Sequence, residues 1–317
     1  MNIRRLIPAA AVTGAVALGL TAVTACSSSD TSDHKGAGRL DVVASFYPMQ
    51  FLAERIGGDH VSVTSLTKPG VEPHDLELSP RQTGRLSDAD FILYLKGLQP
   101  AVDEAIKQSG ASHTLDAATL TTLEDHGTET GGDEHGHEHE GDEAGADPHI
   151  WLDPVKYTEV AKGVGKSLEK TDPDHAADYR KNTDALVKEL GALDTAYRTG
   201  LKNTATKTFI TTHSAFGYLA ERYGLTQEGI AGIDPEAEPS PARISALHSI
   251  AEKKKVTTVF FETLASDKTA KTVARDTGLK TDVLDPLEGI TDSSKGDDYI
   301  EVMKSNLAAL RTALGAK

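Results

Sequence analysis

The sequence predicts an α/β protein with two similar α/β lobes, each built on a central, mostly parallel sheet, and one long backbone helix that joins them. Three observations predict this fold class. From residue 40 onward, short apolar runs alternate with amphipathic runs, which is typical of a parallel sheet with helices on both faces. A continuous apolar stripe then crosses residues 173–203, and the same alternation restarts after it.

The first lobe is expected over residues 39–172. Short runs rich in Val, Leu, Ile and Phe predict strands at 40–46, 61–66 and 91–95. Apolar residues at helical spacing predict helices at 48–57, 79–89, 98–110 and 154–170. Residues 124–147 interrupt this pattern with glycine and charge, and because a packed core cannot be built from them, we expect a mobile loop.

The helix at 173–203 is expected to link the two lobes. Its apolar stripe recurs every three or four residues and consists of Tyr179, Thr183, Leu186, Leu190, Leu193, Tyr197 and Leu201. At 1.5 Å per residue, roughly 30 residues span on the order of 45 Å, which is longer than one small domain is wide. We therefore expect a rigid connection between the lobes.

The second lobe is expected over residues 204–317 and repeats the alternation of the first. Apolar runs predict strands at 206–212, 225–230, 256–262 and 279–285. Amphipathic runs predict helices at 214–224, 240–255, 266–278 and 297–314. Ser240 followed by Pro241 is a favourable helix start, with a capping side chain and a proline in the first turn.

Residues 1–25 are typical of an export signal, with two arginines, an apolar stretch and small residues before the only cysteine, Cys26. Residues 23–26, Val-Thr-Ala-Cys, resemble a bacterial lipobox, in which the cysteine is lipidated. An ordinary cleaved signal that ends near a cysteine is the alternative. Residues 26–38 are small and polar and predict a flexible tether. We therefore expect a chain held by a lipid at Cys26 on the extracytoplasmic face of the cell membrane.

The charge balance argues against a nucleic-acid partner. The chain carries 33 Lys and Arg against 48 Asp and Glu, a formal net charge of −15, and ten of these acids lie within residues 124–147. Nucleic-acid binding requires a basic face. A single cysteine also excludes a disulfide framework.

Four candidate metal ligands lie just beyond predicted strands or in loops on the same expected edge: His74, His149, His213 and Asp285. In open α/β sheets, ligands bind beyond the carboxyl ends of the strands. Two of the four come from each lobe, which is how a metal site between lobes would be built. Each alone has a simpler interpretation as a turn, capping or half-buried residue, so the prediction depends on their joint placement. Glu72 is a possible additional ligand.

The segments KPGVEPHDLELSP, DPHIWLDP, ITTHSAFGYLAERYGL and LDPLEGI resemble those of the cluster A-I solute-binding lipoproteins of ABC importers, specifically the zinc-uptake branch. The resemblance extends from about residue 40 to the end. It implies two α/β lobes joined by a long helix, with Zn²⁺ as the transported ligand at His74, His149, His213 and Asp285. It also implies delivery to an ABC permease and, indirectly, its ATPase subunit. We expect a monomer.

The residue types favour zinc independently of the resemblance. Three imidazoles and one carboxylate form a four-coordinate site that suits Zn²⁺, whereas manganese usually favours more oxygen ligands. A manganese or broader divalent-metal protein of the same importer class remains the alternative. Cu²⁺ could still outcompete zinc in vitro, because it stands higher in the Irving–Williams order.

The acidic loop carries its own histidines: His126, His135, His137 and His139. Flexible imidazoles among carboxylates are expected to give several weak auxiliary metal sites that gather zinc near the main one. A solvated acidic surface that binds nothing specific is the alternative. His149 lies beyond this loop, next to apolar residues, and is assigned to the fixed site.

Catalytic motifs are weak, and we expect no enzyme. The segment GVGKS at 163–167 lacks the first glycine of a phosphate-binding loop and lies inside a predicted helix. The histidine-rich run contains no HExxH zinc motif. A secreted zinc hydrolase with Glu72 as general base is the alternative from another class. An adhesin role, a secondary activity in relatives of the resembling family, cannot be read from residues.

Overall fold

The computed structural model describes residues 38–126 and 146–317. All of these described residues belong to one compact unit. The predictions for the export signal, for Cys26 and for His135, His137 and His139 therefore lie outside the described residues. In the described part, no helix is long and apolar enough to cross a membrane.

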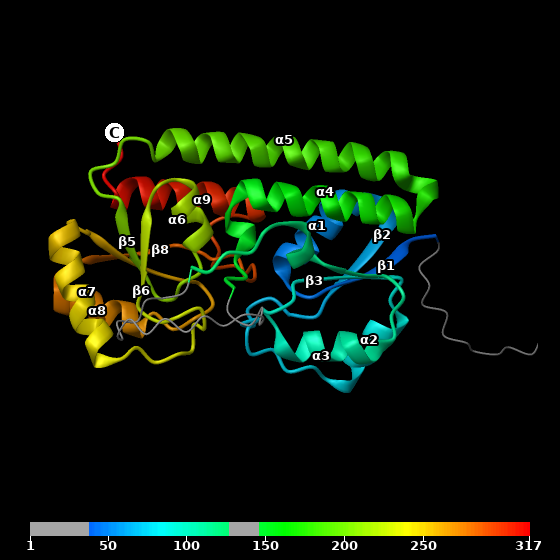
Figure 1. Cartoon of the computed structure of the whole chain (residues 1–317), viewed down its shortest axis with the longest axis horizontal. Coiled ribbons are helices and arrows are strands. Elements are labelled where there is room, and N and C mark those ends of the chain that lie inside the picture. Colours follow the sequence, from blue (N-terminus) through cyan, green and yellow to red (C-terminus); the bar gives the residue numbers. More distant parts are fainter. Residues whose placement is uncertain (1–37, 127–145) are drawn as a thin grey trace, which may run out of the picture. The chain divides into compact units, whose positions relative to one another are not determined.

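The first sheet has four parallel strands in the order β2-β1-β3-β4 (Figure 1). These strands are β1 (Leu40–Ala44), β2 (Val61–Ser65), β3 (Phe91–Tyr94) and β4 (Thr114–Asp116). The three predicted strands are confirmed. β4 was not predicted, because its three residues, Thr-Leu-Asp, contain no apolar run.

Helices cover both faces of this sheet. They are α1 (Tyr47–Gly57), α2 (Pro80–Asp88) and α3 (Pro100–Ser109). In β1, Val42 packs into the large core that includes α1, whereas its neighbour Val43 packs into a separate core with Leu86 of α2 and Val102 of α3. Successive side chains of a strand point to opposite faces, so a strand buried on both faces is apolar throughout.

The second sheet repeats the first, with four parallel strands in the order β6-β5-β7-β8. These strands are β5 (Thr208–Thr211), β6 (Thr226–Gly229), β7 (Thr258–Phe261) and β8 (Lys280–Val283). Its helices are α6 (Gly217–Arg222), α7 (Pro241–Lys254), α8 (Lys268–Thr277) and α9 (Tyr299–Ala313). The expected fold class, two parallel-sheet α/β lobes, is confirmed.

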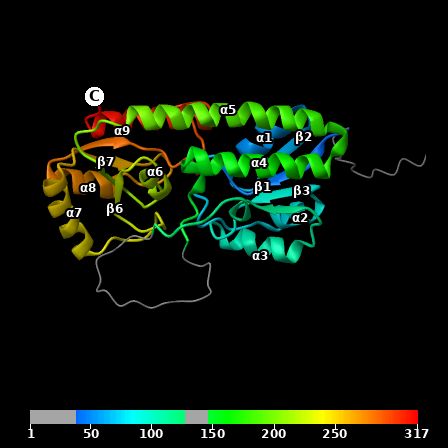
Figure 2. The same cartoon turned by 45° about the horizontal axis from the view of Figure 1, so that its top comes forward.

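Two long helices lie next to each other, α4 (Pro154–Thr171) along the first lobe and α5 (Ala176–Gly200) along both lobes (Figures 1 and 2). α5 contacts α1 and α4 near the first sheet and α9 near the second. It has 25 residues, about 37 Å at the usual rise, and is shorter than predicted because Pro173–His175 form a separate 3₁₀ turn. Its buried residues are the first six of the predicted stripe, and the seventh, Leu201, is buried directly after the helix.

One continuous apolar core joins the lobes. It includes Phe51 from the first lobe, Tyr197 from α5 and Met303 from α9, all at most 4% exposed. Gly165 lets α4 and α5 approach each other closely, because a Cβ there would overlap with Thr183 Oγ1. The glycines of the GVGKS segment thus lie inside helix α4, where Gly165 serves helix packing.

Candidate metal site

The structure brings three of the predicted ligands together. His74 lies in the segment between β2 and α2, His149 directly precedes the 3₁₀ turn Ile150–Leu152, and His213 follows β5 by two residues. The fourth member of the cluster is Glu288, in the segment after β8. One nitrogen from each imidazole and one oxygen of Glu288 all lie within 4.8 Å of one another.

The distances in the cluster fit a small tetrahedral cation. Glu288 Oε1 lies 3.1 Å from Nε2 of His149 and 3.3 Å from Nε2 of both His74 and His213. In a tetrahedron with metal–ligand distances of about 2.0–2.1 Å, two ligand atoms are separated by about 3.3 Å. The carboxylate oxygen therefore already has the spacing to each imidazole that a bound Zn²⁺ requires.

Carboxylates orient two of the imidazoles from behind. Asp147 Oδ1 accepts a hydrogen bond from His149 Nδ1 at 2.7 Å, and Glu262 Oε1 accepts one from His213 Nδ1 at 2.6 Å. Such partners fix the ring orientation and leave Nε2 for the metal, as in most protein metal sites with histidine ligands. The site thus has a prepared outer shell as well as a set of ligands.

Several polar atoms around the cluster are buried without a hydrogen-bond partner. They are Glu72 Oε2, His213 Nε2, Glu262 Oε2 and Glu288 Oε2. His213 Nε2 is near Glu288 but is not aligned for a hydrogen bond. Buried polar atoms are nearly always paired, and leaving one unpaired costs about 1–3 kcal/mol. Their concentration at one point indicates that a cation belongs there.

The electrostatics of the cluster support this inference. Burial opposes ionisation of Glu288, but the charge of His213 and hydrogen bonds from the histidines hold the pKa of Glu288 well below its usual range. Burial likewise opposes a charged His213, yet Glu262 and Glu288 raise its pKa well above the ordinary value. Burial and the nearby Glu288 raise the pKa of Glu72 to about 9. In the metal-free cluster, imidazolium protons thus stabilise the buried carboxylates.

Comparison with known proteins identifies the family. A sequence model described as zinc-uptake complex component A, periplasmic, matches residues 42–313. The chain belongs to this family. It is 40% identical to the high-affinity zinc uptake system protein ZnuA of Bacillus subtilis over 93% of this chain and 94% of that protein.

A second relative and a solved structure are also similar to this chain. It is 37% identical to the zinc-binding lipoprotein AdcA of Streptococcus pneumoniae over 91% of this chain, but it spans only 58% of that longer protein. Among solved structures, the Zn(II)-bound ZnuA-like domain of Streptococcus pneumoniae AdcA is similar, with a TM-score of 0.72 and 34% identity, covering 87% of this chain and 99% of that one.

In this member of the zinc-uptake family, Asp285 does not join the cluster that it was expected to complete. Its Oδ1 accepts a hydrogen bond from Leu287 N at 2.8 Å, and its Oδ2 accepts one from Thr263 Oγ1 at 3.0 Å. The first of these bonds is a local Asp turn. Leu287 has a φ of 58°, in the left-handed region, and the chain then presents Glu288 to the histidines. Asp285 shapes the turn, and Glu288 takes the fourth position.

The two auxiliary candidates within the described residues, Glu72 and His126, also lie outside the group of four. Glu72 borders the cluster, where its Oε1 accepts a hydrogen bond from the backbone N–H of His74 at 3.2 Å, but it is not one of the four grouped residues. His126 belongs to a second group, with Glu124 and Glu221. The sequence signal for Glu288 was its position in the LDPLEGI segment, three residues beyond the carboxylate that was chosen.

Proposed function

We propose that the chain binds Zn²⁺ through His74, His149, His213 and Glu288 and delivers it to an ABC-type importer permease. The observation that carries this proposal is the position of Glu288 Oε1, 3.1–3.3 Å from three imidazole nitrogens. Two ligands follow strands of the first sheet and two follow strands of the second. The names of the relatives, which describe zinc uptake and zinc binding, support the same cation.

The ligand set favours zinc over manganese. Three imidazoles and one carboxylate match the donors that four-coordinate zinc prefers, while manganese sites use more oxygen. No thiolate contributes, since the only cysteine is Cys26. The site therefore lacks the thiolates common in permanent structural zinc sites, as a protein that must release its cargo requires.

The geometry also favours a carrier over a hydrolase. A catalytic zinc typically has three protein ligands and keeps one position open for water. Here four protein side chains each offer one ligand atom, which is enough to fill a tetrahedral shell. Glu72, the residue considered as the general base of a hydrolase, borders this group of four but is not part of it.

Delivery of zinc to an importer requires that the chain be held near the membrane and that a permease and an ATPase subunit be present. We infer that a lipid at Cys26 holds the chain, as a monomer, at the extracytoplasmic face of the cell membrane, where residues 26–38 act as a tether. The permease receives the metal, and the ATPase subunit of the importer, a separate chain, supplies the energy. Release involves the loops that carry the ligands, because one apolar core and helix α5 connect the lobes.

A competitive zinc titration tests the proposed function. The full chain is titrated against a chelator of nanomolar affinity, with manganese in parallel. We expect one tight equivalent of zinc and much weaker manganese binding. His213→Asn should abolish the tight equivalent, whereas His113→Asn, at an exposed histidine of the first lobe, should preserve it. Tight binding that survives His213→Asn would contradict the proposed site.

A further inference from the structure

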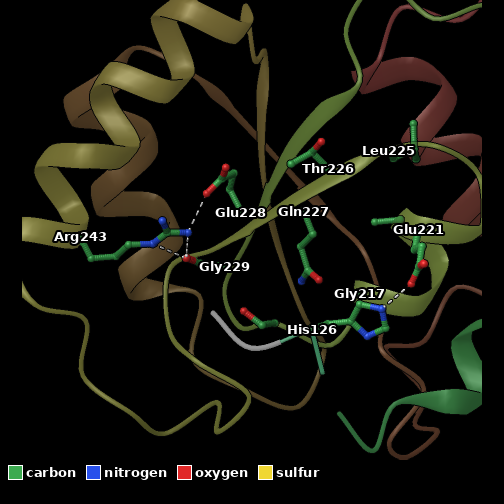
Figure 3. A pocket seen from close by; sticks show the side chains of 11 residues that line it. His126, Gly217, Glu221, Leu225, Thr226, Gln227, Glu228, Gly229 and Arg243 are labelled. Carbon is green, nitrogen blue, oxygen red and sulfur yellow. Dashed lines mark hydrogen bonds and ion pairs between the residues drawn. The ribbon is translucent and has the colours of Figure 1, made fainter. Parts of the chain in front are cut away.

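A second group of ligand atoms lies outside the site already described. It consists of Glu124, His126 and Glu221, with one atom from each within 4.8 Å of the others. His126 Nε2 lies 2.8 Å from Glu221 Oε2. Figure 3 shows these two side chains facing each other along the wall of a cavity of about 460 Å³. Glu221 belongs to α6 of the second lobe, whereas Glu124 and His126 follow the last strand of the first lobe.

The fold makes room for the His126 ring. Gly217, the first residue of α6, lies against it, and a Cβ at this position would overlap with His126 Cβ and come within 2.8 Å of Asp147 Oδ2. The ring also packs edge-on against Tyr218, with centroids 4.3 Å apart. A ring seated in this way is held before any ligand arrives.

The backbone around the group is fixed by hydrogen bonds. Glu124 N donates to Tyr218 Oη at 2.8 Å, and Tyr218 Oη donates to the carbonyl of Asp147 at 2.7 Å. Asp147 N donates to the carbonyl of Glu124 at 2.9 Å. The two chain segments that carry Glu124 and Asp147 are therefore held side by side.

Asp147 connects this group to the inner site. Its Oδ1 accepts from His149 Nδ1 at 2.7 Å, and its Oδ2 accepts from His126 Nδ1 at 3.0 Å. One buried carboxylate thus orients two imidazoles and leaves the Nε2 of each free for another partner. For His149 that partner is Glu288 of the inner cluster, and for His126 it is Glu221. The arrangement that prepares His149 for a metal is repeated at His126.

We propose that Glu124, His126 and Glu221 form an outer metal site that binds a divalent cation more weakly than the inner site and shares Asp147 with it. The choice of Zn²⁺ rests on the proposed function. One imidazole and two carboxylates suit zinc, but fewer imidazoles give lower affinity for it. The side chains of His126 and Glu221 are 15% and 63% exposed, so a cation reaches this site directly from solvent.

The ammonium group of Lys156 competes with a metal ion for the Glu124 carboxylate of the outer site. Lys156 Nζ lies 2.7 Å from Glu124 Oε1 and also donates to the carbonyl of Thr122 at 2.7 Å. It leaves the second oxygen of Glu124 for a metal but lowers the affinity by repulsion. This competition is a further reason to expect an exchanging site, which takes up and releases its metal readily.

A difference titration tests the outer site. Zinc binding to the full chain is compared with binding to Glu221→Gln and to the matched control Glu252→Gln, an exposed carboxylate on α7. We expect Glu221→Gln to keep the tight equivalent and to weaken the next equivalent at least about tenfold. Residues 127–145 are the same in all three chains, so their contribution cancels in the difference.

The outcomes separate this proposal from the proposed function. A second equivalent that is unchanged in Glu221→Gln would contradict the outer site, and loss of the tight equivalent in that variant would show that the two sites are not distinct. A missing tight equivalent in the parent chain would instead contradict the inner site. Asp147→Asn should weaken both equivalents, by about 10- to 100-fold each, because it supports both imidazoles.

Discussion

Glu288 and Asp285 are three residues apart, yet only Glu288 reaches the histidines. Sequence patterns predicted the three histidines because each lies next to a strand end or in a distinctive segment. They could not separate the two carboxylates, since both follow β8 and both are acids. Which carboxylate reaches the histidines depends on the left-handed backbone conformation of Leu287. Leucine rarely adopts this conformation, so the sequence does not indicate it. The strand-end position and the family resemblance predict Asp285, which forms the turn, whereas Glu288 groups with the histidines in the structure.

Removing the carboxylate of Glu288 should disable the inner site. We expect Glu288→Gln to lower zinc affinity by more than about 100-fold, since even outer-shell partners are typically worth 10- to 100-fold. Asp285→Asn is the matched control, because asparagine keeps the oxygen that accepts from Leu287 N. A competitive titration measures both variants. A larger loss in Asp285→Asn than in Glu288→Gln would reverse our assignment of the two residues.

The metal-free protein should become less stable as the pH rises from about 6.5 to 9. The pKa of His213 and that of Glu72 are both raised in the folded state. The protons bound to these two side chains therefore stabilise the folded state at low pH, and this stabilisation is lost as the pH rises through the pKa values of the folded state. Glu288, whose pKa is lowered, acts with the opposite sign but only below about pH 4.5.

Thermal unfolding of the chelator-treated chain across this range measures the effect. Saturating zinc should reduce the slope, because the metal replaces the imidazole protons. A melting temperature of the metal-free chain that is flat or rises with pH would argue against protonated histidines in the cluster.

The helices and longer strands were predictable because their apolar periodicity is strong. β4 was missed, since three edge residues carry no pattern, and the start of α5 was placed too early because Pro173 begins a short 3₁₀ turn rather than the helix itself. The close approach of α4 and α5 was not predictable, because it depends on which residue faces Gly165. The first two differences arise from weak or misleading local patterns, and only the third arises from a tertiary contact.

Adding a methyl group at Gly165 should destabilise the protein. We expect Gly165→Ala to cost about 1–3 kcal/mol of the free energy of unfolding, because the new Cβ meets Thr183 in a tightly packed helix pair. Gly191→Ala in α5 is the control, since a Cβ there meets nothing within 4 Å and should stabilise the helix by about 0.5–1 kcal/mol. Denaturant unfolding of both variants measures the difference. Equal effects of the two changes would exclude the proposed contact.

At the scale of the whole molecule, two sheets with the same strand order share one core and one long helix. The four clustered side chains follow strands of both sheets, so the proposed site exists only where the lobes meet. Wide opening of the lobes would expose that core, and its cost would rise at roughly 25 cal/mol for each Å² of apolar surface. We therefore expect metal exchange to use small movements.

Small-angle scattering should show little change when zinc binds. We expect the radius of gyration of the full chain to change by less than about 1 Å, the scale of backbone movement in pre-organised binding sites. The measurement compares chelator-treated and zinc-saturated chains at the same concentration. A large compaction on zinc binding would mean that the lobes move as separate bodies.

The four proposed ligands of the inner site are spread along the sequence, at positions 74, 149, 213 and 288. A ribosome therefore finishes nearly the entire polypeptide before the last donor appears, and a nascent fragment that ends earlier has at most three of them. Polypeptides that terminate before residue 288 should consequently hold zinc poorly. Tight zinc retention would thus require synthesis to continue at least to Glu288.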